Sequence, residues 1–198
     1  QALWLSPNRA NALAYMAEAY LDMDRPDLAQ ETVDRALTAD PNSYEANYVN
    51  ALIQWNVNYA LDTAADSFEI ASSEAPNLSY IAVDRAWFEW SLGNYEVAED
   101  LLAGVLELNP TNLDALYAMG YLYYQAFGDR DQSLGYLERC LAADNDNISC
   151  LWYRGTIQTV MGDQAGALAS FRALMQTDTQ VPRHFLDAGR AYMNSGDC

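Results

Sequence analysis

Apolar and polar positions alternate along this chain in a pattern that recurs over a long period. Stretches in which apolar residues return three and four positions apart, as on one face of a helix, are separated by short polar breaks. Six breaks carry a residue that we use as a repeat mark: Pro7, Pro41, Pro76, Pro110, Asn145 and Thr179. Successive marks are separated by 34, 35, 34, 35 and 34 residues. A fixed period of this length predicts a solenoid of stacked helix pairs.

Each period also places small residues where two helices would cross. Ten residues after the marks stand Ala17, Ala51, Ala86, Gly120, Gly155 and Gly189. A second helix follows, with a small residue, a large apolar residue four positions later, and a further core residue three positions after that. In order along the chain, these positions are Ala29, Val33, Ala36, Ala64, Phe68, Ala71, Ala98, Leu102, Val105, Ser133, Leu137, Cys140, Ala167, Phe171 and Leu174. Gly93, Gly128 and Gly162 lie between the two helices, where glycine can take the left-handed conformation that ends a helix.

This arrangement closely resembles the tetratricopeptide repeat, a helix-turn-helix of 34 residues with small residues at the helix crossing. The family's aromatic residue, three positions after the first small residue, is Tyr20, Tyr123 or Tyr192 here, and a polar residue replaces it in the other units. The second and fourth units carry one extra residue near the internal turn. The resemblance covers essentially residues 1–198. It implies an all-α, right-handed superhelical solenoid of stacked antiparallel helix pairs.

The marks divide the chain into five full repeats with a partial unit at each end. We expect residues 1–6 to end a preceding second helix, repeats 1 to 5 to span residues 7–40, 41–75, 76–109, 110–144 and 145–178, and residues 179–198 to form the first helix of an incomplete repeat. The chain is then either a piece of a longer protein or is completed by another chain. An end-to-end contact that does not close would give a filament. The residues expected to take part in such self-association are Arg183, Phe185, Arg190, Tyr192 and Cys198.

Charge narrows the range of partners. The chain has 28 acidic and 10 basic residues, a net charge of -18, and all its basic residues are arginines. Such a chain repels a polyanion, which argues against nucleic acid and against the RNA-binding pentatricopeptide repeats of similar period. The absence of lysine also excludes a phosphate-binding loop of the lysine type. No stretch reaches the apolar length of a membrane span. We therefore expect a protein or peptide partner, including another copy of the chain.

Aromatic residues gather at one set of positions in the predicted first helices. The resemblance implies that first helices line the concave surface, and offsets of 4, 7, 11 and 14 residues from each mark give its side chains, including Glu18 and Glu45 in the first two repeats. The candidate partner-binding residues are Tyr48, Trp55, Tyr80, Trp87, Trp90, Tyr117, Tyr121, Tyr124 and Trp152. A contiguous aromatic surface is typical of a binding site for an amphipathic helix or an extended peptide. The alternative is that these rings simply pack the solenoid's own groove.

The three cysteines bear on the cellular compartment in which the protein is found. Cys140 lies five residues before Asn145 and Cys150 five residues after it, so a turn at Asn145 would bring them opposite one another. They form either a disulfide or two buried thiols. Cys198 is then left for an intermolecular link or a free thiol. A disulfide would indicate an oxidising compartment, and we therefore favour an extracytoplasmic or cell-surface location.

The sequence offers little for catalysis or metal binding. The single histidine, His184, has no recognisable nucleophile beside it, and the cysteines lack the short paired spacing of structural zinc sites. The acidic clusters lack the pattern of a calcium loop. We therefore expect no cofactor, no metal and no enzymatic activity, and interpret the chain as a protein–protein interaction scaffold. Two alternatives stay open: a structural subunit that assembles head to tail into an extracellular filament, and an accessory module of a larger enzyme.

Overall fold

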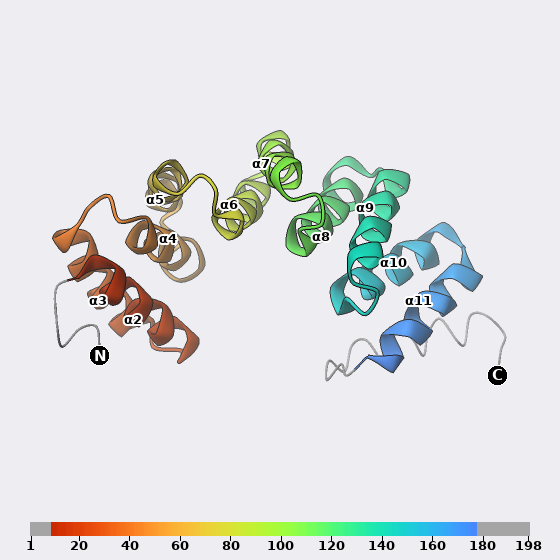
Figure 1. Cartoon of the computed structure of the whole chain (residues 1–198), viewed down its shortest axis with the longest axis horizontal. Coiled ribbons are helices and arrows are strands. Elements are labelled where there is room, and N and C mark those ends of the chain that lie inside the picture. Colours follow the sequence, from red (N-terminus) through yellow and green to blue (C-terminus); the bar gives the residue numbers. More distant parts are fainter. Residues whose placement is uncertain (1–8, 178–198) are drawn as a thin grey trace. The chain divides into compact units, whose positions relative to one another are not determined.

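A computed structural model describes residues 9–177, and every regular element within that range is a helix (Figure 1). The chain divides into two compact units, residues 1–88 and 89–198. Helix α6 (Ser79–Leu92) contains the boundary between them. The all-α fold expected from the repeat pattern is confirmed.

The first unit contains two full helix pairs followed by most of α6. Helices α2 and α3 form one pair, and α4 and α5 form the next, with α2 also packed against α4. The bounds are α2 (Ala10–Asp22), α3 (Pro26–Ala39), α4 (Tyr44–Ile53) and α5 (Leu61–Glu74), and a π-helical turn, η1 (Gln54–Asn58), extends α4. The core between the helices includes the fully buried residues Leu13, Val33, Ile53 and Phe68.

The second unit repeats this plan. Helix α8 pairs with α9, and α10 pairs with α11, while α7 packs against α8. The bounds are α7 (Tyr95–Leu108), α8 (Leu113–Leu122), η2 (Tyr123–Phe127), α9 (Arg130–Ala143), α10 (Ile148–Met161) and α11 (Gln164–Gln176). The side chains at the starts of four of these helices accept a hydrogen bond from the backbone N–H three residues on, and each such cap contributes about 1 kcal/mol. These caps are Asn112, Asp129, Asn147 and Asp163.

The helix crossings contain the small residues that the repeat pattern predicts. Ala17 and Ala51 are completely buried. A Cβ atom added to Gly120 would lie 2.9 Å from Cγ of Leu137, and one added to Gly155 would lie 2.9 Å from Cζ of Phe171. Both distances are shorter than atoms in contact tolerate, so these pairs of helices can approach only because the residue is glycine. The predicted small-residue crossings are thus confirmed within the described range.

The one-residue insertions in the second and fourth repeats are accommodated at the ends of their first helices. Both α4 and α8 end in a single π-helical turn, the form that typically absorbs one extra residue. Each π turn is closed by a left-handed residue, Tyr59 with φ 56° and Gly128 with φ 69°. Gly93 and Gly162 follow the first helices of the third and fifth repeats in the same conformation. The left-handed glycines predicted at the internal turns are confirmed.

Cys140 and Cys150 form a disulfide in the second unit. Cys140 lies in α9 and Cys150 in α10, and their Cα atoms are 6.5 Å apart. Both residues are fully buried. The bond therefore links the second helix of one repeat to the first helix of the next, across the turn at Asn145.

Candidate functional site

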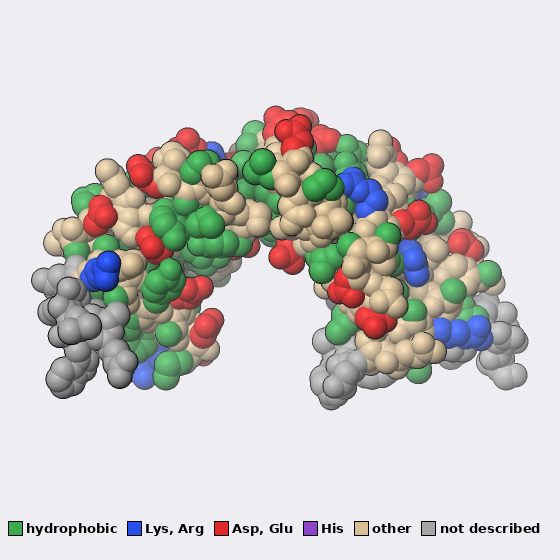
Figure 2. All heavy atoms as spheres, viewed as in Figure 1, with side chains coloured by type: hydrophobic (Ala, Val, Ile, Leu, Met, Phe, Trp, Pro, Cys, Tyr) green, Lys and Arg blue, Asp and Glu red, His purple; other side chains and the backbone are tan. Residues whose placement is uncertain are grey.

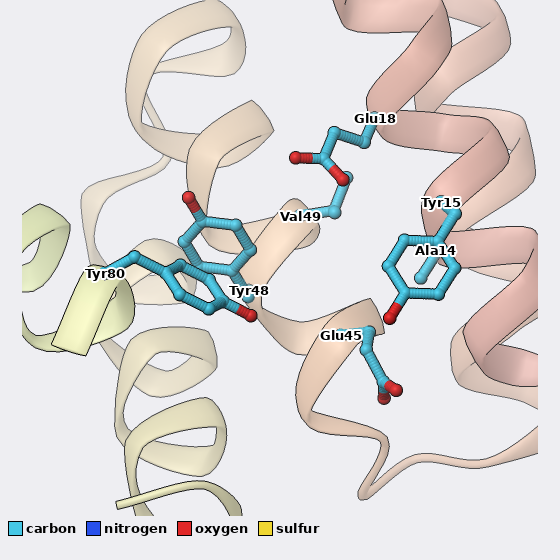
Figure 3. Close-up of a pocket in the computed structure, with 7 residues that line it drawn as sticks. All are labelled: Ala14, Tyr15, Glu18, Glu45, Tyr48, Val49 and Tyr80. Carbon is cyan, nitrogen blue, oxygen red and sulfur yellow. The ribbon is translucent and has the colours of Figure 1, made fainter. Parts of the chain in front are cut away.

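A hollow of about 320 Å³ opens on the first unit beside the first helices of three successive repeats. We call it the tyrosine–glutamate hollow. Residues from α2, α4 and α6 line it: Ala14, Tyr15, Glu18, Glu45, Tyr48, Val49 and Tyr80. Figure 3 shows the Tyr15 ring extending from α2 towards α4, with Tyr48 and Tyr80 on the other side of the opening. Each of these helices stands where the sequence pattern predicts the first helix of a repeat, so the hollow lies on the face where the sequence predicts a binding surface.

Two packed tyrosines form one wall of the hollow. The ring centroids of Tyr48 and Tyr80 are 5.0 Å apart, and the rings meet edge to face at 80°. The Tyr48 hydroxyl donates a 2.6 Å hydrogen bond to Oδ2 of Asp84 on α6. Burial, reinforced by this bond, raises the pKa of Tyr48. The Tyr48 ring is therefore fixed, whereas Tyr80 remains 43% exposed beside it.

Carboxylates give the hollow a negative charge. Glu18 extends from α2 and Glu45 from α4, and none of the described residues lining the hollow is basic. The Ser43 hydroxyl donates a 2.9 Å hydrogen bond to Oε2 of Glu45, which orients that carboxylate. Burial raises the pKa of Tyr80 to about 12, and the charges of Glu18 and Glu45 add to the shift. The field in the hollow thus disfavours a further negative charge.

The second unit places its aromatic residues around one buried ring. Tyr153 on α10 is only 2% exposed. Its ring centroid lies 5.2 to 5.9 Å from those of four neighbours, which together with Tyr153 form what we call the Tyr153 cluster: Tyr117, Tyr121, Tyr124 and Trp152. Nε2 of Gln125 donates a 2.9 Å hydrogen bond to the Tyr153 hydroxyl. Burial raises the pKa of Tyr153, so the hydroxyl stays neutral inside the cluster.

The tryptophans of the predicted surface are also partly enclosed by other rings. Trp55 lies on η1 and packs edge to face against Phe68 and Phe88, with centroids 6.4 and 5.8 Å apart. The Trp90 ring meets that of Tyr121 at 5.2 Å in the second unit. Trp87 is half-buried on α6. All of the aromatic candidates within the first helices therefore combine packing with partial exposure.

The structure brings together residues that the sequence reasoning did not single out. Tyr15, Val49 and Tyr153 each lie eight residues after a repeat mark, which is outside the four offsets predicted to line the concave surface. Glu18 and Glu45 lie at predicted offsets but are not among the aromatic candidates for partner binding. The signal that could have found them is a change in this eighth position from one repeat to the next, because on a helix it lies next to the positions four and eleven residues after the mark.

Several other predictions fall outside the described residues. Arg183, Phe185, Arg190, Tyr192 and Cys198, predicted to mediate self-association, belong to this group. So do His184, residues 1–6 and the incomplete repeat at 179–198. The structure therefore leaves the self-association surface as a prediction.

The remaining surface gives no sign of metal chemistry within the described range. Among residues 9–177, no three side chains of His, Cys, Asp or Glu are grouped so that they could hold a metal ion. None of the described helices has the length and apolar content that crossing a bilayer requires.

Figure 2 shows acidic side chains spread over the visible surface of both units, with few basic ones among them.

Comparison with known proteins identifies the repeat. Two family models, both described as tetratricopeptide repeat, match residues 16–78 and 89–150, together more than half of the chain. No curated protein matches the chain.

Solved structures share its fold. PilF of Pseudomonas aeruginosa is similar with a TM-score of 0.82 at 18% identity, over 95% of this chain and 85% of that one. PilW, a type IV pilus biogenesis factor, has a TM-score of 0.83 at 21% identity, over 96% and 87%. A thermophilic protein of Thermus thermophilus with the same repeats has a TM-score of 0.75 at 18% identity, over 93% and 99%. The chain belongs to the tetratricopeptide repeat family.

Proposed function

We propose that this protein is a non-catalytic scaffold that binds a segment of a partner protein on the first-helix faces of its repeats. The family and the fold support a protein–protein interaction scaffold. The observation that carries the finer proposal is the tyrosine–glutamate hollow, where first helices leave half-exposed rings around an opening. Tyrosine suits recognition because it offers a large rigid ring with a polar tip.

The second unit contributes a preformed surface. Its aromatic side chains are held by one another around Tyr153, so a partner that contacts their exposed edges would order few additional rotamers. Trp90, Tyr124 and Trp152 are half-buried and contribute such edges. An amphipathic helix or an extended segment would fit a face of this kind.

A peptide selection against the intact chain tests the proposal. We expect a display library of random peptides to yield binders whose affinity falls at least about tenfold in Tyr15→Ser/Tyr80→Ser, the loss that removing hot-spot rings produces. The matched control is Leu61→Ser/Val97→Ser, which removes exposed apolar residues from the second helices α5 and α7. Selected peptides that bind both variants equally well would argue against a first-helix site.

Self-assembly into a head-to-tail filament stays a second proposal. The residues expected to mediate it lie at 183–198, so its test is a measurement in solution. Light scattering coupled to size-exclusion chromatography would show a concentration-dependent mass if the ends associate. The likeness to PilW, a pilus biogenesis factor, supports the fold alone at 21% identity and does not favour either proposal.

The disulfide supports a location outside the reducing cytosol. Disulfides persist in oxidising compartments and are uncommon where thiols are kept reduced. The Cys140–Cys150 bond is fully buried, which protects it from reagents in solution. A quantitative thiol assay on protein isolated from its source, with and without denaturant, would test this: two free thiols at these positions would contradict it.

A further inference from the structure

We propose that the tyrosine–glutamate hollow receives an arginine side chain from the partner segment. The inference rests on the proposed function, since it specifies the chemistry of the partner at that same face. It is carried by three features of the hollow: its size, its two carboxylates, and the exposed tyrosine rings at its sides.

The size of the hollow suits one long side chain. Its volume of about 320 Å³ lies at the low end of the range of roughly 300–1,000 Å³ for small-molecule sites. Ala14 and Val49, which are 0% and 2% exposed, contribute apolar surface to its lining. The opening is bounded by Tyr15, which is 57% exposed, and by Tyr80. A side chain that enters between these two rings buries its alkyl part against them.

The charge of the hollow selects a cation. Glu18 and Glu45 both line the hollow, and their charges add to the rise in the pKa of Tyr80 that burial mainly causes. The same charges favour a positive group by attraction, and no described basic side chain of the lining neutralises them. The net charge of -18 over the whole chain adds a long-range attraction for basic segments.

The combination of rings and carboxylates favours arginine over lysine. A guanidinium group is flat, so it can stack on a tyrosine ring while its N–H groups donate to a carboxylate. Lysine has a compact, strongly hydrated ammonium group that cannot do both at once. The bond from the Ser43 hydroxyl holds the Glu45 carboxylate in place, and the bond from the Tyr48 hydroxyl to Asp84 holds the Tyr48 ring in place. The site is therefore organised before the partner arrives.

Two capped peptides differing in a single charge test the inference on the full chain. The probes are acetyl-leucyl-arginyl-leucine amide and the same peptide with citrulline, which keeps the shape of arginine and removes its charge. Binding is followed by NMR of the tyrosine rings in protein with isotope-labelled tyrosine. We expect the arginine peptide to shift the signals of Tyr15 and Tyr80 and to bind about tenfold more tightly than the citrulline peptide. A lysine peptide should fall between the two.

Glu18→Gln/Glu45→Gln removes the charge and keeps the shape of the two side chains. In this variant we expect the preference for arginine over citrulline to disappear. The control is Glu31→Gln/Asp66→Asn, which lowers the charge of the first unit equally at exposed positions of the second helices α3 and α5. This control should keep most of the preference.

Three results would overturn the inference: no shift at Tyr15 and Tyr80, an equal affinity for both peptides, or an arginine preference that survives in Glu18→Gln/Glu45→Gln. The failure of the inference is distinct from that of the proposed function. If display-selected peptides depend on the first-helix face but carry no arginine preference, the scaffold proposal stands and the arginine site does not.

Discussion

In both units the first helices carry tyrosines at equivalent positions of the repeat, but these tyrosines differ in how exposed they are. The comparison is sharpest eight residues after the repeat marks, where the first repeat has Tyr15 and the fifth has Tyr153. Tyr15 is 57% exposed at the side of a hollow, whereas Tyr153 is 2% exposed at the centre of a cluster. The presence of tyrosine therefore does not decide whether the face is open. Its neighbours in the adjacent repeat do.

The residues around each tyrosine explain the difference. Moving the pattern of the hollow three repeats along the chain places Tyr121 at the position of Glu18 and Ser149 at that of Glu45. Tyr153 itself takes the position of Val49. The second unit thus has rings where the first has a carboxylate and a small apolar residue. An aromatic-rich stretch is a packed surface in one unit and an acidic opening in the other.

Replacing Tyr153 and Tyr15 in turn by alanine should show that the buried tyrosine contributes to stability and the exposed one does not. We expect Tyr153→Ala to lower the free energy of unfolding by about 3–4 kcal/mol, because it removes a buried ring in contact with four others. Tyr15→Ala should change it by less than about 0.5 kcal/mol, as is usual for an exposed side chain. Urea unfolding followed by far-UV circular dichroism measures both.

Tyr153→Phe is the control for the hydroxyl group. It keeps the ring and removes the acceptor of the Gln125 hydrogen bond, so we expect a loss of only about 1 kcal/mol. If Tyr15→Ala proved as destabilising as Tyr153→Ala, the contrast between an open and a closed face would be wrong.

The disulfide gives a second way to separate the units. Both cysteines of the bond belong to the second unit, and reducing the Cys140–Cys150 bond releases a short closed loop. We expect reduction to destabilise this unit by about 2–3 kcal/mol, mainly by freeing the unfolded chain. Because the bond is buried, it is reduced in denaturant and the protein is refolded before the measurement. Hydrogen exchange measured by mass spectrometry on the oxidised and the reduced protein should show faster exchange in α9 and α10 of the reduced form and unchanged exchange in α2 and α3.

A variant without the bond controls for other effects of the reductant. Cys140→Ala/Cys150→Ala should exchange as fast as the reduced protein and should not respond to reductant. Equal loss of protection in α2 and α3 would mean that the two units do not respond independently to this bond.

The repeat pattern predicted those parts of the fold that depend on local rules. The crossing residues had to be small because two helix backbones meet there, and Gly120 and Gly155 leave no room for a Cβ atom. The internal turns required left-handed residues, which glycine supplies at Gly93 and Gly162. The equal distances of two cysteines from Asn145 similarly indicated which pair could meet.

The state of the candidate surface could not be predicted in the same way. Helical periodicity gives the direction of Tyr48 or Tyr121, but the exposure of each ring depends on side chains one repeat, or about 34 residues, away. Trp55 shows the difficulty, because the π turn η1 changes the helical spacing just where this ring packs against Phe68 and Phe88. The extra residue was visible in the sequence, whereas the way it is absorbed was not.

The two π turns provide the finest comparison between the units. Both are closed by a left-handed residue, but that residue is Tyr59 in the first unit and Gly128 in the second. A left-handed backbone conformation costs an ordinary residue about 1–2 kcal/mol. Glycine avoids this cost, but its greater freedom in the unfolded chain cancels part of the gain in stability. Tyr59 is 76% exposed, so little packing is lost with its ring.

We therefore expect Tyr59→Gly to raise the free energy of unfolding by about 0.5–1 kcal/mol. Gly128→Tyr should lower it by a similar amount, because no atom within 4 Å would obstruct the added Cβ and only the backbone is strained. Thermal unfolding of the two single variants and of the double variant measures these changes, which should cancel in the double variant because the sites lie in separate units. Destabilisation by Tyr59→Gly would instead show that the Tyr59 ring makes a contact that stabilises the first unit by more than the left-handed backbone destabilises it.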